Sequence, residues 1–142
     1  MSRLAERLDG PVGLLARSLM ATLFLLASLS NALDLAGFGS KLAGEGTSAM
    51  LAGPVFYLQL FGGLALVLGL WTRPFALALS AFCLASAMIA YSDLATPTDM
   101  VMLLKNIALT GGFLVLFLHG PGPWSIDARI ANPRPRPATP KI

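Results

Sequence analysis

Four long apolar runs dominate the chain, and short polar or Gly- and Pro-rich stretches separate them. The runs cover residues 12–33, 54–70, 75–92 and 100–118. A helix that crosses a bilayer needs about 20 mostly apolar residues, because each residue advances about 1.5 Å through a hydrocarbon core roughly 30 Å thick. The pattern therefore predicts an all-α integral membrane protein, a bundle of four spanning helices.

The stretches between the runs have the composition of loops and chain breaks. Residues 36–53 are Gly-rich and polar, residues 71–74 read Trp-Thr-Arg-Pro, and Pro97 lies between the third and fourth runs. Alternating Gly and Pro after His119 end the last run. We expect a cytoplasmic N-terminal segment over residues 1–11, the membrane bundle over 12–127, and a basic, Pro-rich cytoplasmic tail over 128–142.

The composition agrees with a membrane protein and excludes several other classes. Hydrophobic residues make up 56% of the chain and charged residues 12%, against about 25% charged in typical soluble proteins. The net charge of +3 comes from basic ends, with Arg129, Arg134, Arg136 and Lys141 crowded near the C-terminus. No motif for reading bases or phosphates accompanies them, so nucleic acid is not an expected partner.

The basic residues also predict the orientation, since Lys and Arg in short loops favour the cytoplasmic side. Arg73 and both basic termini fall on one side of the four spans, whereas Lys41 stands alone in the loops of the other. We therefore expect a multi-pass protein of the bacterial cytoplasmic (inner) membrane with both termini in the cytoplasm.

Metal and haem chemistry have few candidate ligands. Cys83 is the only cysteine and His119 the only histidine. One cysteine forms no intrachain disulfide, and this pair is too small a ligand set for a zinc site or a bis-histidine haem site. We expect no metal and no intrinsic cofactor.

Small residues mark the predicted contacts between helices. Lipid tails give helices no hydrophobic reason to associate, so close packing through small side chains must hold them together. Gly62-Gly63, followed by Ala65 and Gly69, forms such a strip on the second span, and Ala108 with Gly112 forms another on the fourth. The double glycines of the second and fourth spans suggest a duplicated helical hairpin, although chance similarity between apolar runs would also produce them.

Polar side chains recur at the predicted outer end of every span. Gln59 interrupts an otherwise apolar run, and an unpaired amide in lipid costs several kcal/mol. We expect it to bond within a polar cluster, which is either a structural clamp or a site for a ligand such as a quinone headgroup. Lys105 lies within the fourth run, and intramembrane cations often mark function, but its side chain could instead snorkel outward to lipid phosphates. The predicted members are Asn31, Gln59, Tyr91, Lys105 and Asn106.

A second polar group falls near the predicted cytoplasmic interface. Arg17, Arg73 and Asp127 reach this level, with Trp124 as an interfacial anchor. An ion-paired cluster is one interpretation. The alternative is that Arg17 snorkels to lipid headgroups while the other two are solvated.

The chain resembles the DoxX family of small four-span bacterial membrane proteins. The resemblance rests on "LDLAGF", "QLFGGLALVLGLWTRP", "KNIALTGGFL" and "GPGPWSID", in this order, between about residues 16 and 127. It implies a four-helix membrane bundle associated with membrane redox systems, including subunits of quinone-linked oxidoreductases. Relatives often have Lys where this chain has Asn31 and Glu where it has Gln59. The resemblance therefore implies a neutral amide pair in place of an ion pair.

Three functions follow as hypotheses. The first is a non-catalytic accessory or anchoring subunit of a larger membrane complex, quinone-linked respiratory or otherwise redox, with the bilayer and other membrane subunits as partners. The second is a quinone-reactive oxidoreductase component that uses Lys105, Asn106 and Gln59 together with a partner subunit. The third is a carrier for a small solute.

Overall fold

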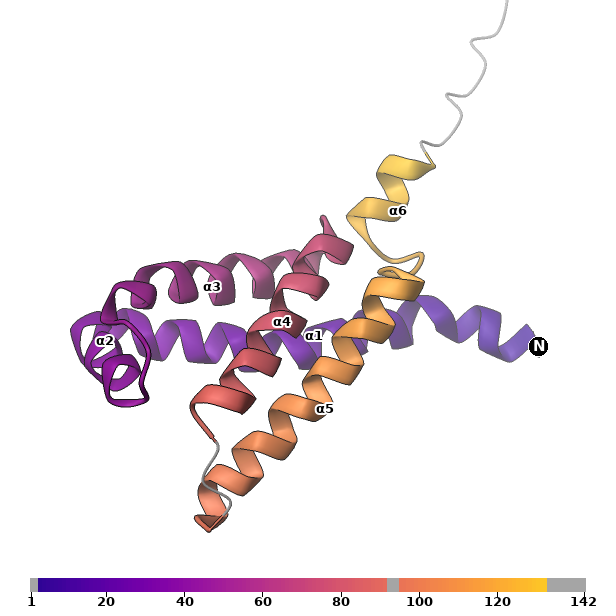
Figure 1. Ribbon diagram of the computed structural model, residues 1–142. Coiled ribbons are helices and arrows are strands. Elements are labelled where there is room, and N and C mark those ends of the chain that lie inside the picture. Colours follow the sequence, from indigo (N-terminus) through magenta and orange to yellow (C-terminus); the bar gives the residue numbers. More distant parts are fainter. Residues whose placement is uncertain (1–2, 92–94, 133–142) are drawn as a thin grey trace, which may run out of the picture.

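A computed structural model describes residues 3–91 and 95–132, and over these ranges the chain is helical without a strand. Four segments are long and apolar enough to cross a membrane: Leu8–Leu33, Ala49–Leu68, Thr72–Ile89 and Pro97–His119. This confirms the predicted all-α membrane bundle. The elements are α1 (Arg3–Leu33), α2 (Leu35–Gly44), the 3₁₀ turn η1 (Ala49–Leu51), α3 (Ala52–Leu68), α4 (Thr72–Ile89), α5 (Pro97–His119) and the short α6 (Ile126–Ala131) (Figure 1).

The spanning helices form two hairpins. Helix α1 packs along α3, and α4 packs along α5, while α3 and α4 meet near the turn that joins them. We call the end of the bundle at that turn the inner end, and the end that carries α2 the outer end. The two hairpins cross, and their outer ends point in different directions (Figure 1).

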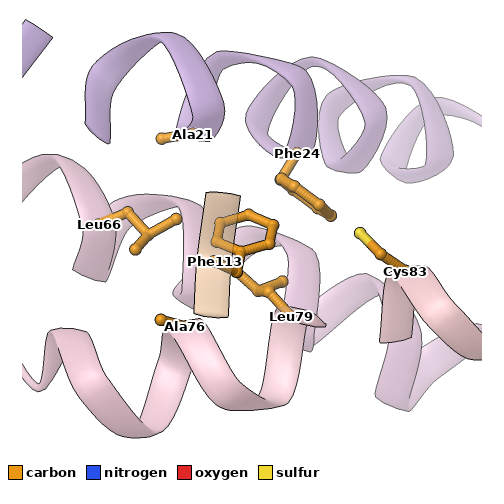
Figure 2. Close-up of a cluster of buried hydrophobic side chains, with 7 residues drawn as sticks. All are labelled: Ala21, Phe24, Leu66, Ala76, Leu79, Cys83 and Phe113. Atoms are coloured by element: carbon orange, nitrogen blue, oxygen red, sulfur yellow. The ribbon is translucent and has the colours of Figure 1, made fainter. Parts of the chain in front are cut away.

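The hairpins meet at a small apolar core to which every spanning helix contributes. Phe24 of α1 and Phe113 of α5 have ring centroids 5.5 Å apart, and Phe24 also meets Phe82 edge to face at 6.4 Å. Aromatic pairs of this kind add about 0.5–1.5 kcal/mol beyond their buried area. The buried cluster consists of Ala21, Phe24, Leu66, Ala76, Leu79, Cys83 and Phe113 (Figure 2).

The double glycine of α3 serves two contacts at once. A Cβ on Gly63 would lie 2.8 Å from Leu25 Cδ2 of α1, and one on Gly62 would lie 3.1 Å from Leu79 Cδ1 of α4. Consecutive glycines therefore let helices approach α3 from two sides, as small residues do in membrane bundles.

The predicted strip on α5 is reduced to one glycine. A Cβ on Gly112 would lie 3.0 Å from Met20 Cε of α1, whereas Gly111 faces open space and Ala108 is exposed. Ala108 and Gly112 stand one turn apart, and of these two only Gly112 is shown against a side chain of α1.

Three segments differ from the loops and boundaries expected from the sequence. Residues 35–44 form α2 rather than a loop, because the Asp34 carboxylate caps its first turn, with Gly37 N donating to Oδ1 at 2.8 Å. Helix α1 begins at Arg3, within the expected N-terminal segment, where Leu, Ala, Glu and Arg all favour helix. Helix α6 crosses the expected boundary at residue 128, and residues 133–142 of the predicted tail lie outside the described residues.

Candidate functional site

The inner end is organised by a buried arginine. Arg17 is 1% exposed, and its Nη1 donates to the backbone oxygen of Leu66 at 3.0 Å. Its Nη2 donates to the backbone oxygen of Trp124, and its Nε donates to that of Gly13 at 3.3 Å. Leu66 lies in the last turn of α3, where carbonyls have no full set of intrahelical donors. Arg17 thus ties α1 both to the end of α3 and to the segment after α5.

The turn after α3 is shaped to receive this guanidinium. Gly69 closes α3 in the left-handed region with φ +66°, and Leu70 N donates back to Ala65 O at 2.9 Å. A Cβ on Gly69 would overlap Arg17 Nη1 and Ser125 Cβ. Only glycine therefore satisfies both the backbone conformation and the space at this position.

Asp127 caps α4 from a distant part of the chain. Its Oδ1 accepts a hydrogen bond from Trp71 N at 2.8 Å, and its Oδ2 accepts one from Thr72 N at 2.9 Å. The backbone N–H of Asp127 donates to Gly69 O at 2.9 Å. A carboxylate at a helix N-terminus satisfies unpaired N–H groups and complements the helix dipole. Trp71 stands at the N-cap without a side-chain acceptor, so Asp127 supplies what the local sequence lacks.

The three residues of the predicted interface cluster lie around one turn, and backbone groups are their hydrogen-bond partners. Arg17, Arg73 and Asp127 all border the α3–α4 turn, but the described ranges contain no ion pair among them within 4.0 Å. The snorkelling alternative is wrong for Arg17, which is buried. Arg73 is exposed, with Nη2 3.5 Å from Leu118 O. Backbone oxygens accept from the two arginines, and backbone N–H groups at the start of α4 donate to Asp127.

Trp124 lies against α1 at the same level. A Cβ on Gly10 would overlap its indole ring, so the ring rests directly on the α1 backbone. The side chain is nevertheless 58% exposed, as expected of an aromatic anchor where membrane meets water. Ser125, which follows, is buried and starts α6, because its Oγ accepts from Ala128 N at 3.1 Å.

At the outer end, the structure joins the two amides that interrupt α1 and α3. Asn31 Nδ2 donates to Gln59 Oε1 at 3.0 Å, and Gln59 is 6% exposed. The bond crosses between the two helices of one hairpin. It explains how a primary amide is retained in an apolar run, since pairing removes most of the desolvation penalty.

The other predicted members of the outer cluster do not bond to this pair. Lys105 is half-buried and its Nζ donates to Met102 Sδ on its own helix at 3.1 Å. Asn106 is 7% exposed, and its side-chain amide has no hydrogen bond within the described residues. Tyr91 is half-buried just after α4. These residues belong to the second hairpin, whose outer end diverges from that of the first (Figure 1).

Several residues of the inner site escaped the sequence analysis. Gly69 was assigned to a helix contact, although its place at the end of an apolar run is typical of a helix C-cap. Gly10 was not considered, and Trp71 and Ser125 were noted only as parts of a turn and of a family motif. Among these three, only Ser125 carried a usable signal, a capping residue followed by an acid in the first turn of the helix that it starts.

The described part of the chain also has no metal-binding constellation. Within residues 3–91 and 95–132, no group of three or more His, Cys, Asp or Glu side chains could hold a metal ion.

The fold is an integral membrane bundle of four spanning helices. At one end, the buried Arg17 and the cap that Asp127 forms on α4 hold the helices together. The sequence model of the DoxX family matches residues 12–92, which is more than half of the chain. The protein therefore belongs to the DoxX family, and it is an integral inner membrane protein.

Two relatives from Escherichia coli K12 support this membership. The chain is 36% identical to inner membrane protein YqjF over 127 residues, covering 89% of this chain and 97% of YqjF. It is 27% identical to inner membrane protein YphA over 123 residues, covering 82% of this chain and 88% of YphA. No solved structure matches the chain significantly.

Proposed function

We propose that the protein is an accessory or anchoring subunit of a larger membrane complex, and that α1 carries the surface that meets the partner. The proposed complex is a quinone-linked respiratory or other redox assembly. Its redox character rests on the resemblance to the DoxX family, whereas the partner surface rests on the structure of α1. The chain itself performs no chemistry in this proposal.

A leucine-rich stripe along α1 is the observation that carries the proposal. Its members are all exposed, from 45% at Leu8 to 84% at Leu33, and they recur at alternating steps of three and four residues. Exposed Thr22 fills the one position of the repeat without a large apolar side chain, and its hydroxyl donates to Ser18 O at 2.7 Å. The stripe consists of Leu8, Val12, Leu15, Leu19, Leu26, Leu29 and Leu33.

The period of this stripe favours a helix over lipid as its neighbour. A straight α-helix drifts about 20° per heptad away from a strict seven-residue repeat. Two helices that supercoil around each other with a left-handed twist remove that drift, so a seven-residue stripe stays in contact with the partner helix. Lipid tails require apolar side chains but impose no repeat. Because α1 has a seven-residue seam along its membrane span, a partner helix is the neighbour that fits it.

The test compares α1 with a matched face of α4. Leu19 and Leu26 would both be replaced by Trp, and in the control Leu77 and Leu84, also exposed and seven residues apart, would be replaced likewise. Each protein is released from its own membranes in mild detergent and weighed intact by native mass spectrometry. We expect a stoichiometric redox partner with the wild type and the α4 control, and its loss with the α1 pair.

Two results would contradict this function. A wild-type chain that is released alone, or only as copies of itself, has no partner to anchor. A partner that survives the α1 substitutions but is lost with those on α4 meets a different face.

A second candidate function, binding of a quinone headgroup, is supported by Asn106. Asn106 is 7% exposed and its side-chain amide has no hydrogen bond within the described residues, and Lys105, the residue directly before it, is half-buried. The amide and the ammonium are donors of the kind that quinone carbonyls accept from, and an amide without a partner gains a hydrogen bond from such a ligand. The solute-carrier hypothesis stays a prediction from the sequence.

Quinone titration of the purified protein tests this candidate. We expect saturable ubiquinone binding that is lost in Asn106→Leu and in Lys105→Ala. Thr110→Val is the control, because the Thr110 hydroxyl already donates to Asn106 O on its own helix at 2.8 Å. Binding that survives both substitutions, or fails equally in the control, would refute the site.

A further inference from the structure

A large open cavity lies at the inner end, between α6 and the hairpin of α1 and α3. Its volume is about 1310 Å³. Membrane helices supply one wall, through Leu14 of α1 and through Val67 and Leu68 at the end of α3. The other lining residues come from Pro123–Ser125, from α6, and from Asn132 directly after α6, and Arg129 and Asn132 supply polar side chains.

The two sets of lining residues differ in chemistry. Leu14, Val67 and Leu68 belong to segments long and apolar enough to lie within a bilayer. Arg129 lies on α6, beyond the last of these segments. The cavity therefore has an apolar, hydrocarbon-like wall on the membrane helices and a cationic side chain on α6.

The charge of Arg129 is not neutralised by the part of the chain that the structure describes. Its guanidinium has neither an ion pair nor a hydrogen bond within residues 3–91 and 95–132. The nearest acid in sequence, Asp127, already has both carboxylate oxygens bonded to the N-terminus of α4. An anion that enters the cavity would thus meet a cation without a competing carboxylate.

The level of the cavity is that of a membrane interface. Trp124 lines it, and its exposed indole beside α1 is typical of a residue at the headgroup layer. Basic pockets between membrane helices at this level bind anionic lipid headgroups.

We propose that this cavity is a binding site for an anionic phospholipid. The phosphate is held by Arg129 with help from the Asn132 amide, and an acyl chain runs along Leu14, Val67 and Leu68. Charge complementarity selects an anionic headgroup over a zwitterionic one. The volume, which exceeds that of most small-molecule pockets, accommodates a headgroup with the upper part of its chains.

Native mass spectrometry with added lipid tests the proposal. Delipidated protein receives phosphatidylglycerol or phosphatidylcholine, and bound lipid is counted for the wild type, Arg129→Gln and Arg73→Gln. Arg73 is the matched control, because it is also an exposed arginine near the inner end but does not line this cavity. We expect preferential phosphatidylglycerol binding that falls about fivefold in Arg129→Gln and less than twofold in Arg73→Gln.

A second variant tests the apolar wall without changing charge. Leu68→Trp places a larger side chain at a half-exposed position on the cavity wall, and we expect it to weaken phosphatidylglycerol binding while Arg129 is intact. Inorganic phosphate is added in parallel, and we expect it not to displace the lipid.

Four outcomes would overturn the proposal. These are equal binding of the two lipids by the wild type, equal losses in the two arginine variants, an unaffected Leu68→Trp, and displacement by inorganic phosphate alone. The first two would indicate general surface electrostatics, and the last two an anion site without a place for an acyl chain.

Discussion

Arg17 and Leu66 are joined by a hydrogen bond of 3.0 Å that connects a buried guanidinium on α1 to a backbone carbonyl in the last turn of α3. The other Arg17 bonds also end on backbone oxygens, those of Gly13 and Trp124. A buried cation is costly unless its donors are satisfied, and here each of the three guanidinium nitrogens donates to a carbonyl. The bond therefore couples the packing of the α1–α3 hairpin to the position of the segment that follows α5.

Replacing Arg17 should loosen the inner end. Arg17→Lys keeps the charge but presents a point donor that cannot reach Leu66 O and Trp124 O together, and Arg17→Gln loses the charge as well. Hydrogen bonds to charged groups contribute about 1.5–3 kcal/mol each, so we expect either variant to lose about 3 kcal/mol of stability. Thermal unfolding in mild detergent measures the loss.

Limited proteolysis after Trp124 gives a local reading of the same change. Cleavage of α6 should become faster in both Arg17 variants, because the Trp124 carbonyl is no longer held. If Arg17→Lys behaved like the wild type in both measurements, the fork-like geometry of the guanidinium would not matter.

Gly69→Ala should be far more damaging than the same change at Gly111. The first combines left-handed strain of about 1–2 kcal/mol with overlap against Arg17 and Ser125. The second adds a methyl group in open space within α5, where alanine favours helix by about 1 kcal/mol. We expect a lower melting temperature for Gly69→Ala and an equal or higher one for Gly111→Ala. Similar shifts in the two would contradict the structure of the α3–α4 turn.

Asp127→Asn should weaken the start of α4. An amide keeps one acceptor oxygen for the N–H groups of Trp71 and Thr72 and loses the charge that complements the helix dipole. We expect a loss of about 1–2 kcal/mol, in the range measured for helix caps. Hydrogen exchange at the first turn of α4 should speed up, and unchanged protection there would show that the cap is dispensable.

A double-mutant cycle on Asn31 and Gln59 should reveal a coupling energy between them. Each residue is replaced by Leu singly and then together, and we expect a coupling of about 0.6 kcal/mol, typical of hydrogen bonds between membrane helices. Gln59 with Lys105 serves as the control pair, because the structure has no bond between them. A coupling that is larger in the control pair would place the polar contact elsewhere.

Replacing the two amides by residues of opposite charge gives a further test of the same contact. Gln59→Glu alone should destabilise the protein, because it places a charge at a position only 6% exposed. Adding Asn31→Lys should recover much of that loss, since the two positions lie within bonding distance. Failure of the second substitution to rescue the first would argue against their proximity.

The sequence predicted the features that depend on composition along a single helix. Four spans follow from the lengths of apolar runs, because the thickness of a bilayer sets a minimum length. An amide in such a run must find a polar partner, and the resemblance to the DoxX family implied that Asn31 is the partner of Gln59. Close contacts at Gly62 and Gly63 followed from the need for small residues between membrane helices.

Only the tertiary structure decided what Arg17 and Asp127 bind, because their partners are backbone groups that every residue carries and no sequence pattern marks. It also decided that the hairpins cross, which separates Lys105 and Asn106 from the amide pair at the predicted shared depth. Depth in a membrane follows from counting residues along each helix. Lateral neighbours depend on the crossing of helices, which arises from many side-chain contacts at once.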